Sequence, residues 1–115
     1  MHELAVCERL IEKVSALAVE HQAARVTRIV LQVGPLSGIE AIQLAQAFSI
    51  ARCGTVAQEA ELEIQTSPIV VFCPRCDIET EAAVNYMLCA RCGGWQVEIK
   101  SGTELILKSM QMLAG

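Results

Sequence analysis

The chain opens with a hydrophobic pattern that is typical of an amphipathic helix. Apolar residues recur at steps of three and four between Leu4 and Ala18, which places them on one helical face. The opposite face carries the charged residues Glu8, Arg9, Glu12, Lys13 and Glu20. This pattern predicts a helix of about 16 to 19 residues that begins near residue 3.

The next segments predict a strand and a second helix. Residues 26–33 alternate as a strand, with Ile29, Leu31 and Val33 on one face. A turn at 34–38 contains two glycines and a proline. Apolar residues from 41 to 51 then mark a second helix, which we expect to be closed by Gly54.

The second half of the chain predicts short strands. Residues 61–66 alternate between apolar and polar, and 69–72 form a short apolar strand. We expect two further strands at 96–100 and 103–112, joined by a tight hairpin turn. This order predicts an α+β fold: a small mixed sheet with two helices on one face and an inserted metal-binding module.

Composition and charge narrow the classes of function. The chain has 115 residues, 53% hydrophobic and only 3% aromatic, which suits one domain with an aliphatic core and a stabilising metal. Its net charge of −4 and scattered cations disfavour binding to nucleic acid. We see no secretion signal and no apolar run long enough to span a membrane, so we expect a cytoplasmic protein. Six cysteines in a reducing compartment indicate metal or redox chemistry.

Four of the cysteines form two CxxC pairs, Cys73/Cys76 and Cys89/Cys92. This spacing predicts a closed tetrahedral zinc site with four thiolate ligands, which is structural because no position stays open for water. Gly93 and Asp77 follow the two pairs and suit the positive φ that each turn requires. A thioredoxin-like redox pair and two disulfides are the alternatives, but a redox motif occurs once and the compartment disfavours disulfides.

The remaining candidate ligands are isolated in the sequence. We expect Cys7 and Cys53 to be small buried hydrophobic residues. His21 is expected to be solvated near the end of the first helix. At the N-terminus, the Met1 amine, the amide and imidazole of His2 and the Glu3 amide offer four nitrogens, and a planar nitrogen set suits Ni(II) or Cu(II).

These features together resemble the HypA/HybF family of hydrogenase nickel-incorporation proteins, over essentially the whole chain. The matching segments are Met1-His2-Glu3-Leu4, Cys7-Glu8, Arg25-Val26, residues 34–40, Gly54-Thr55-Val56-Ala57, Ala60-Glu61-Leu62, both CxxC pairs, and Gly102-Thr103-Glu104-Leu105. The resemblance implies a metallochaperone rather than an enzyme. It holds Ni(II) through Met1, His2 and Glu3 and binds structural Zn(II) through Cys73, Cys76, Cys89 and Cys92.

The resemblance also implies partners and a domain plan. A HypB-type maturation GTPase and the precursor of the [NiFe]-hydrogenase large subunit are the expected partners, with urease maturation served in some relatives. The nickel-binding domain takes residues 1–72, completed by 95–115, and the zinc-binding insert takes 73–94. We expect a monomer or weak homodimer without nucleic-acid or membrane partners. The insert contains no histidine, so it cannot supply the extra ligand that some members have.

Two functions of other classes remain as alternatives. A zinc-ribbon adaptor that binds protein or nucleic acid needs basic or aromatic surface near the ribbon. The segment offers Arg75, Arg91, Lys100 and the aromatics Tyr86 and Trp95, and we expect Trp95 to pack against the ribbon. A hydrolase or redox enzyme needs a catalytic constellation, and we find no Ser/His/Asp set and no phosphate-binding glycine loop.

Overall fold

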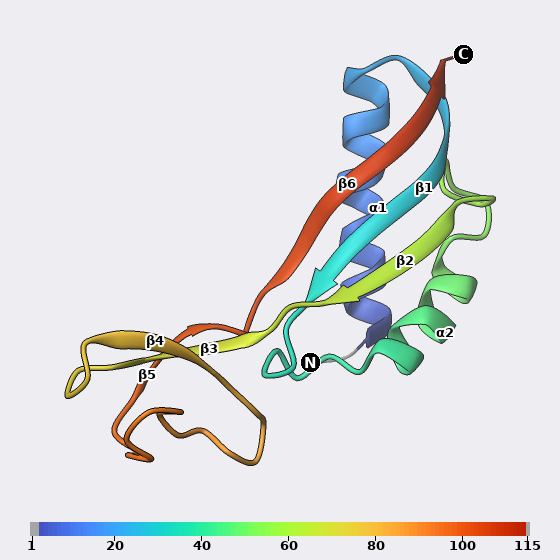
Figure 1. Ribbon diagram of the computed structural model, residues 1–115. Coiled ribbons are helices and arrows are strands. Elements are labelled where there is room, and N and C mark those ends of the chain that lie inside the picture. Colours follow the sequence, from blue (N-terminus) through green and yellow to red (C-terminus); the bar gives the residue numbers. More distant parts are fainter. Residues whose placement is uncertain (1–2, 115) are drawn as a thin grey trace.

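The computed structural model describes residues 3–114 and contains two helices and two three-stranded sheets. The elements are α1 (Glu3–Glu20), β1 (Ala23–Val33), α2 (Ala41–Ala51), β2 (Glu61–Thr66), β3 (Ile69–Cys73), β4 (Ile78–Ala82), β5 (Glu98–Ser101) and β6 (Leu105–Ala114). Figure 1 shows the two sheets lying end to end, with both helices beside the first. The molecule therefore measures 55 × 25 × 16 Å, with a radius of gyration of 17.5 Å.

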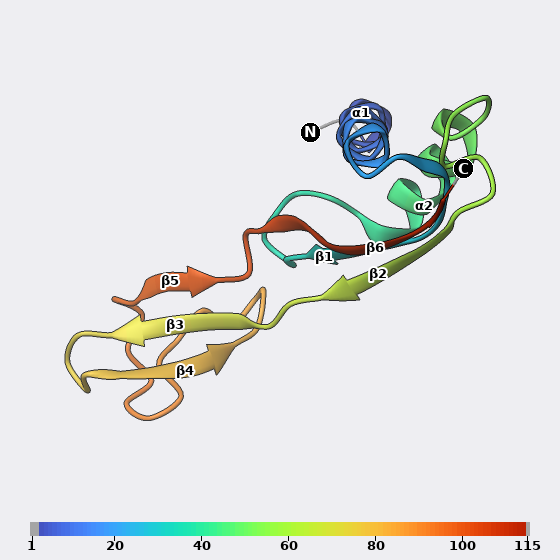
Figure 2. The same cartoon turned by 90° about the horizontal axis from the view of Figure 1, so that it is seen from above.

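The first sheet has the order β2-β1-β6 and is mixed. β1 pairs in parallel with β2 and antiparallel with β6. Figure 2 shows that α1 and α2 cover the same face of this sheet. The fold prediction of an α+β protein with two helices on one face is confirmed.

The main core lies between these helices and the first sheet. Val14, Leu44 and Ile29 are fully buried there and come from α1, α2 and β1. The opposite face of the sheet is polar, where Arg28 forms ion pairs with Glu61 and Glu63 across the β1–β2 pair. The alternation read from residues 26–33 and 61–66 therefore reports a sheet with one face buried and one face solvated.

The second sheet has the order β4-β3-β5 and is antiparallel. The predicted hairpin between residues 96–100 and 103–112 is wrong, because β5 pairs with β3 whereas β6 pairs with β1. Residues 102–104 instead carry the chain from one sheet to the other. β4 was not predicted, although its half-buried Ile78, Thr80 and Ala82 alternate with exposed Glu79 and Glu81.

The two sheets meet at a junction fastened by the loop that follows β1. The Gly34 amide donates to the Glu104 carbonyl, and the Leu36 amide donates to the Gly102 carbonyl, each at 2.7 Å. The Ser67 amide donates to the Val33 carbonyl at 3.2 Å. Both connections between the sheets, 67–68 and 102–104, are thus bonded to the end of β1.

Replacing Gly34 with alanine should weaken this junction strongly. An added Cβ would overlap the carbonyl group of Gly102, and backbone atoms cannot move aside without breaking the hydrogen bonds described above. We expect the free energy of unfolding to fall by about 3 kcal/mol in urea denaturation. Gly38→Ala is the matched control. Gly38 has φ +81° and nothing within 4 Å of an added Cβ, so it should cost only about 1 kcal/mol. Equal losses in the two variants would contradict the packing argument.

Candidate metal centre

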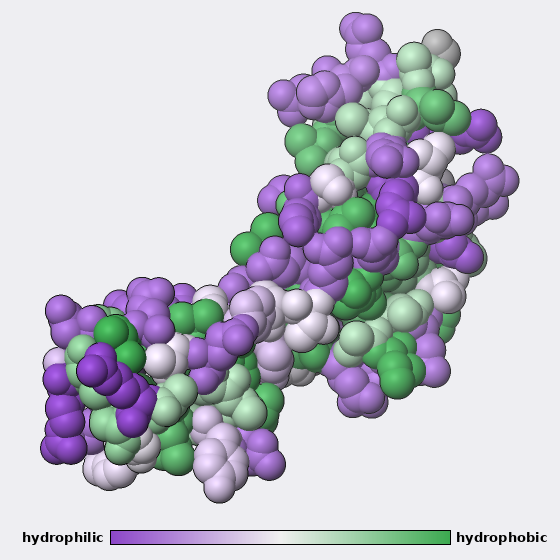
Figure 3. Space-filling model, in the orientation of Figure 1, coloured by the Kyte–Doolittle hydropathy of each residue, from purple (hydrophilic) through white to green (hydrophobic). Residues whose placement is uncertain are grey.

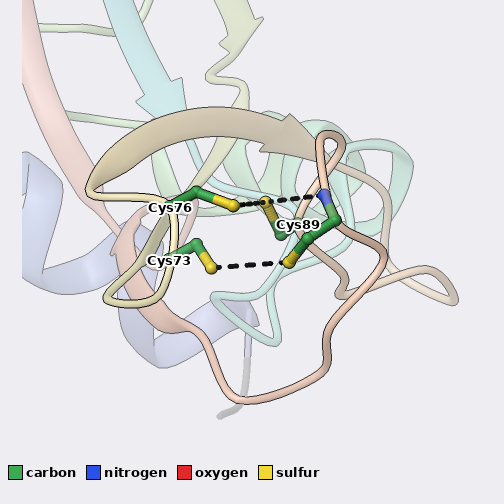
Figure 4. Close-up of side chains that lie close together, drawn as sticks. Cys73, Cys76 and Cys89 are labelled. Carbon is green, nitrogen blue, oxygen red and sulfur yellow. Dashed lines mark hydrogen bonds between the residues drawn. The ribbon is translucent and has the colours of Figure 1, made fainter.

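Four cysteines converge at one end of the second sheet. Cys73 ends β3, Cys76 lies in the turn before β4, and Cys89 and Cys92 lie in the connection between β4 and β5. Their Sγ atoms all lie within 4.8 Å of one another. Figure 4 shows the labelled side chains of Cys73, Cys76 and Cys89 pointing toward a common centre. Residues 16 positions apart in the sequence are therefore brought together, as the spacing predicted.

The sulfur separations fit one tetrahedral metal ion. The Sγ atoms of Cys73 and Cys92 are 3.7 Å apart, and those of Cys76 and Cys89 are 3.9 Å apart. A tetrahedral ion with sulfur ligands at about 2.3 Å separates those ligands by about 3.8 Å. The donor set and its spacing therefore match a four-thiolate site, and no sulfur has to move far to complete it.

The two CxxC turns have the same backbone geometry. The Asp77 amide donates to the Cys73 carbonyl at 2.7 Å, and the Gly93 amide donates to the Cys89 carbonyl at 2.8 Å. Asp77 has φ 56° and Gly93 has φ 73°. The prediction of positive φ after each pair is confirmed. Each turn thereby places two sulfurs on the same side of the backbone.

Backbone amides in the second turn favour the ionised form of Cys89. The amides of Arg91 and Cys92 donate to Cys89 Sγ at 3.4 and 3.5 Å. These bonds, that of Cys92 first, lower the pKa of the Cys89 thiol to about 6. Desolvation and then the neighbouring thiols raise the pKa of Cys76 to about 12. A bound cation must therefore displace protons from the quartet, so metal affinity falls as the pH falls.

A residue outside the CxxC motifs also supports the quartet. The Ala90 amide donates to Thr80 Oγ1 at 3.1 Å, which ties the second turn to β4. The sequence analysis missed Thr80 because it missed β4. The alternation of residues 78–82 is the signal that would have found both.

One side of the quartet is exposed to solvent. Cys73 and Cys89 are buried, whereas Cys92 is exposed. Trp95 is 73% exposed, so the prediction that it packs against the ribbon is wrong. Trp95 instead lines a hollow of about 220 Å³ beside Cys73 and Cys92, with most of its ring in solvent.

Comparison with known proteins decides the family. A family model described as "Hydrogenase/urease nickel incorporation, metallochaperone, hypA" matches residues 1–112. The chain belongs to the HypA family. A hydrogenase maturation factor HypA from Nitrosospira multiformis is 36% identical over 113 residues, which cover 98% of each chain. The HypA of Aquifex aeolicus is also 36% identical, over 97% of each chain.

Solved HypA structures share the fold. The solution structure of the Ni metallochaperone HypA from Helicobacter pylori superposes with a TM-score of 0.73 at 30% identity and covers 100% of both chains. A second solution structure of a HypA protein gives a TM-score of 0.75 at 30% identity, over 100% of this chain and 98% of that one. The arrangement of two helices and two small sheets is therefore that of HypA proteins.

The N-terminal candidates stand differently from the cysteines. Met1 and His2 lie outside the described residues, so the nickel-binding set stays a prediction. Glu3 begins α1, and its Oε2 accepts a hydrogen bond from the Glu40 amide at 3.3 Å. The start of α1 is thus bonded to the segment that leads into α2, beside the junction loop (Figure 1).

The two cysteines outside the quartet differ from each other. Cys7 is fully buried in the main core, and its thiol donates to the Leu44 carbonyl at 3.5 Å, as predicted. The prediction for Cys53 is wrong: it is exposed just beyond α2, because the turns after residue 51 carry it away from the core. His21 is exposed after α1, as predicted.

This difference predicts selective alkylation. Burial, followed by the charge of Glu3, raises the pKa of the Cys7 thiol to about 11, so little reactive thiolate exists at pH 8. Iodoacetamide should label Cys53 and spare Cys7 in the folded, metal-loaded protein, as peptide mass mapping would show. Labelling in denaturant is the control and should reach both residues. Fast labelling of Cys7 without denaturant would contradict its placement in the core.

Across residues 3–114, neither helix has the length and apolar character that crossing a membrane requires.

Proposed function

We propose that this chain is a nickel metallochaperone that carries Ni(II) to the precursor of the [NiFe]-hydrogenase large subunit. The observation that carries the proposal is the family match over residues 1–112, which takes in both the N-terminal Met1-His2-Glu3 and the cysteine quartet. The curated relatives are named as hydrogenase maturation factors. Nickel is the cargo in this proposal, so the chain must both hold the ion and release it.

The proposed nickel ligands are the α-amine of Met1, the amide and imidazole of His2 and the amide of Glu3. Four nitrogens in a plane suit Ni(II). A site at the chain end is easy to open, because few protein contacts have to break when the ion leaves. The hydrogen bond from the Glu40 amide to Glu3 would hold Glu3 in place while Met1 and His2 release the metal.

The proposed role of the quartet is to hold a structural Zn(II). Four thiolates suit zinc and complete a tetrahedral shell, which leaves no position for a substrate or water. We propose the insert at 73–94 as the zinc-binding unit and residues 1–72 with 95–115 as the nickel-binding domain. Zinc would then fix the CxxC turns against β3 and β4, while nickel binds separately at the N-terminus.

The proposed partners follow from the few candidate catalytic groups in the sequence of this chain. We propose a non-enzymatic, cytoplasmic protein that relies on a HypB-type GTPase for nucleotide hydrolysis. A net charge of −4 supports a role without nucleic acid. We propose a monomer or weak homodimer as the working form.

The test of this function is nickel binding by the untagged protein and its His2→Ala variant. The imidazole and one chelate ring are lost in the variant, so isothermal titration with Ni(II) should show affinity weaker by more than about a hundredfold. Zinc content and the melting curve should stay unchanged, since His2 precedes α1 in the sequence and is no part of the cysteine quartet. His21→Ala is the matched control and should bind nickel like the parent. Unchanged nickel affinity in His2→Ala would refute the assignment.

A further inference from the structure

β6 has a long edge that pairs with no other strand among residues 3–114. Its ten residues bond to β1 on one side only. Leu105, Ile106 and Leu113 are 38%, 45% and 45% exposed along it. Figure 3 shows hydrophobic surface at the margin of this sheet. An open edge of this length offers backbone donors and acceptors to an added strand.

An apolar groove runs beside this edge, between α1 and β6. It has a volume of about 260 Å³. Its apolar lining comes from both elements and from β1 beneath them: Val6, Leu10, Leu31, Leu105 and Leu107. α1 packs against β1 and α2, so it leaves its β6 side open. A strand added to β6 would point every second side chain into this groove.

Two cations stand at the rim of the groove. Arg9 and Lys13 line it from α1, and both are exposed. In the described part of the chain, neither forms an ion pair. A protein with a net charge of −4 thus places two unpaired cations next to its longest open strand edge. This charge favours an occupant that carries carboxylates.

The same charge argues against a symmetric pair of β6 strands. β6 contains Lys108 and no carboxylate, so the β6 strand of a second copy would itself offer no acidic side chain to Arg9 or Lys13. The other open edge, β2, is less suited to a docking role. It has only six residues, and its polar face is occupied by the ion pairs of Arg28.

We propose that the β6 edge and its groove bind an extended acidic segment of another protein. The segment adds a strand to the first sheet. Its groove-facing side chains alternate along that strand, with aliphatic residues entering the groove and carboxylates meeting Arg9 and Lys13. This binding surface lies on the nickel-domain sheet and does not depend on the identity of the metal cargo.

The probe is a designed peptide, acetyl-Val-Thr-Glu-Thr-Glu-Thr-Ile-amide. Its odd positions place two carboxylates between two aliphatic residues on one face, and threonine at the even positions favours a strand. The two carboxylates are about 7 Å apart along the strand, which matches the spacing of about 6 Å between Arg9 and Lys13 on α1. We expect one-to-one binding by calorimetry and slower hydrogen exchange of the β6 amides. A peptide with lysine in place of glutamate should bind at least about tenfold weaker. Two further peptides are N-methylated on the backbone amides of one strand edge or of the other. Only methylation of the edge that faces β6 should abolish binding.

Two lysine reversals on opposite faces test the groove directly. Lys13→Glu should weaken binding of the acidic peptide at least about tenfold and improve binding of the lysine peptide. Lys108→Glu, an equal charge change on β6, should alter either affinity less than about threefold, because Lys108 bonds to Gln65 on the other face of the sheet. No binding of the acidic peptide, equal effects of the two variants, or unchanged exchange at β6 would overturn the proposal. Protection of β6 by self-association, seen in sedimentation, would assign the edge to a second copy and also overturn it.

Discussion

Cys76→Ser is expected to abolish tight zinc binding and to unfold the second sheet. A serine hydroxyl is a poor replacement for a thiolate ligand, and zinc supplies about 10–16 kcal/mol to the folding of small modules of this kind. The second sheet has little else to stabilise it. Its buried apolar side chains besides cysteine are Ile69 and Val71, and no residue of this sheet belongs to the main core cluster.

The measurement combines zinc analysis with residue-resolved hydrogen exchange. Amides of β3 to β5 should exchange at least about a hundredfold faster in Cys76→Ser, whereas those of β1 should stay protected by the main core. Cys53→Ser is the matched control, because it removes an exposed thiol outside the quartet, and it should keep its zinc and its protection. Full protection of the second sheet in metal-free Cys76→Ser would show that zinc does not hold it together.

A Gly-Gly extension placed before Met1 is expected to remove tight nickel binding. It converts the Met1 amine into an amide and leaves two more residues between the free amine and His2. A single added residue would not serve, because its amine, two amides and the His2 imidazole would form a new planar set of four nitrogens. The fused chelate rings can then no longer form with the same donors, so Ni(II) affinity should fall by more than about a hundredfold in isothermal titration. The fold should not respond, because the change precedes Glu3, where the described structure begins.

A Gly-Gly extension after Gly115 provides the control for this experiment. It changes the mass equally and leaves the N-terminus free, so its nickel affinity should match that of the parent. Intact mass spectrometry must verify both termini before titration, since a retained residue before Met1 changes the set of nickel donors. Equal nickel affinity in the two extended proteins would place the cargo site elsewhere in the chain.

Local patterns of apolar and polar residues predicted most of the helices and strands, because each of these elements buries one face at a fixed period. The stripe from Leu4 to Ala18 became α1, and the alternation at 26–33 became the buried face of β1. The pairing of strands was harder to predict. Gly102 looked like the tip of a hairpin, but it lies where the chain crosses between sheets. The crossing, rather than a hairpin, is determined by the contacts of residues 34–36 with 102–104, which are distant in sequence.

The cysteine quartet was predictable for a different reason. Two CxxC turns have few ways to satisfy a tetrahedral ion, so their spacing restricts the three-dimensional arrangement. Side chains without such a restriction were predicted less well. Trp95 was expected to pack against the ribbon and Cys53 to be buried, both from their chemical character. Both are exposed, because burial depends on the space that neighbouring elements leave. The nickel ligands remain a prediction.

The end-to-end placement of the two sheets affects how the size of this protein is measured. A compact chain of 115 residues has a radius of gyration of about 13 Å, whereas this molecule reaches 17.5 Å. That radius is the one expected of a compact chain about twice as long. A lone molecule should therefore elute from a gel-filtration column near the position of a globular dimer. Light scattering, which reports mass directly, is the appropriate way to count its subunits.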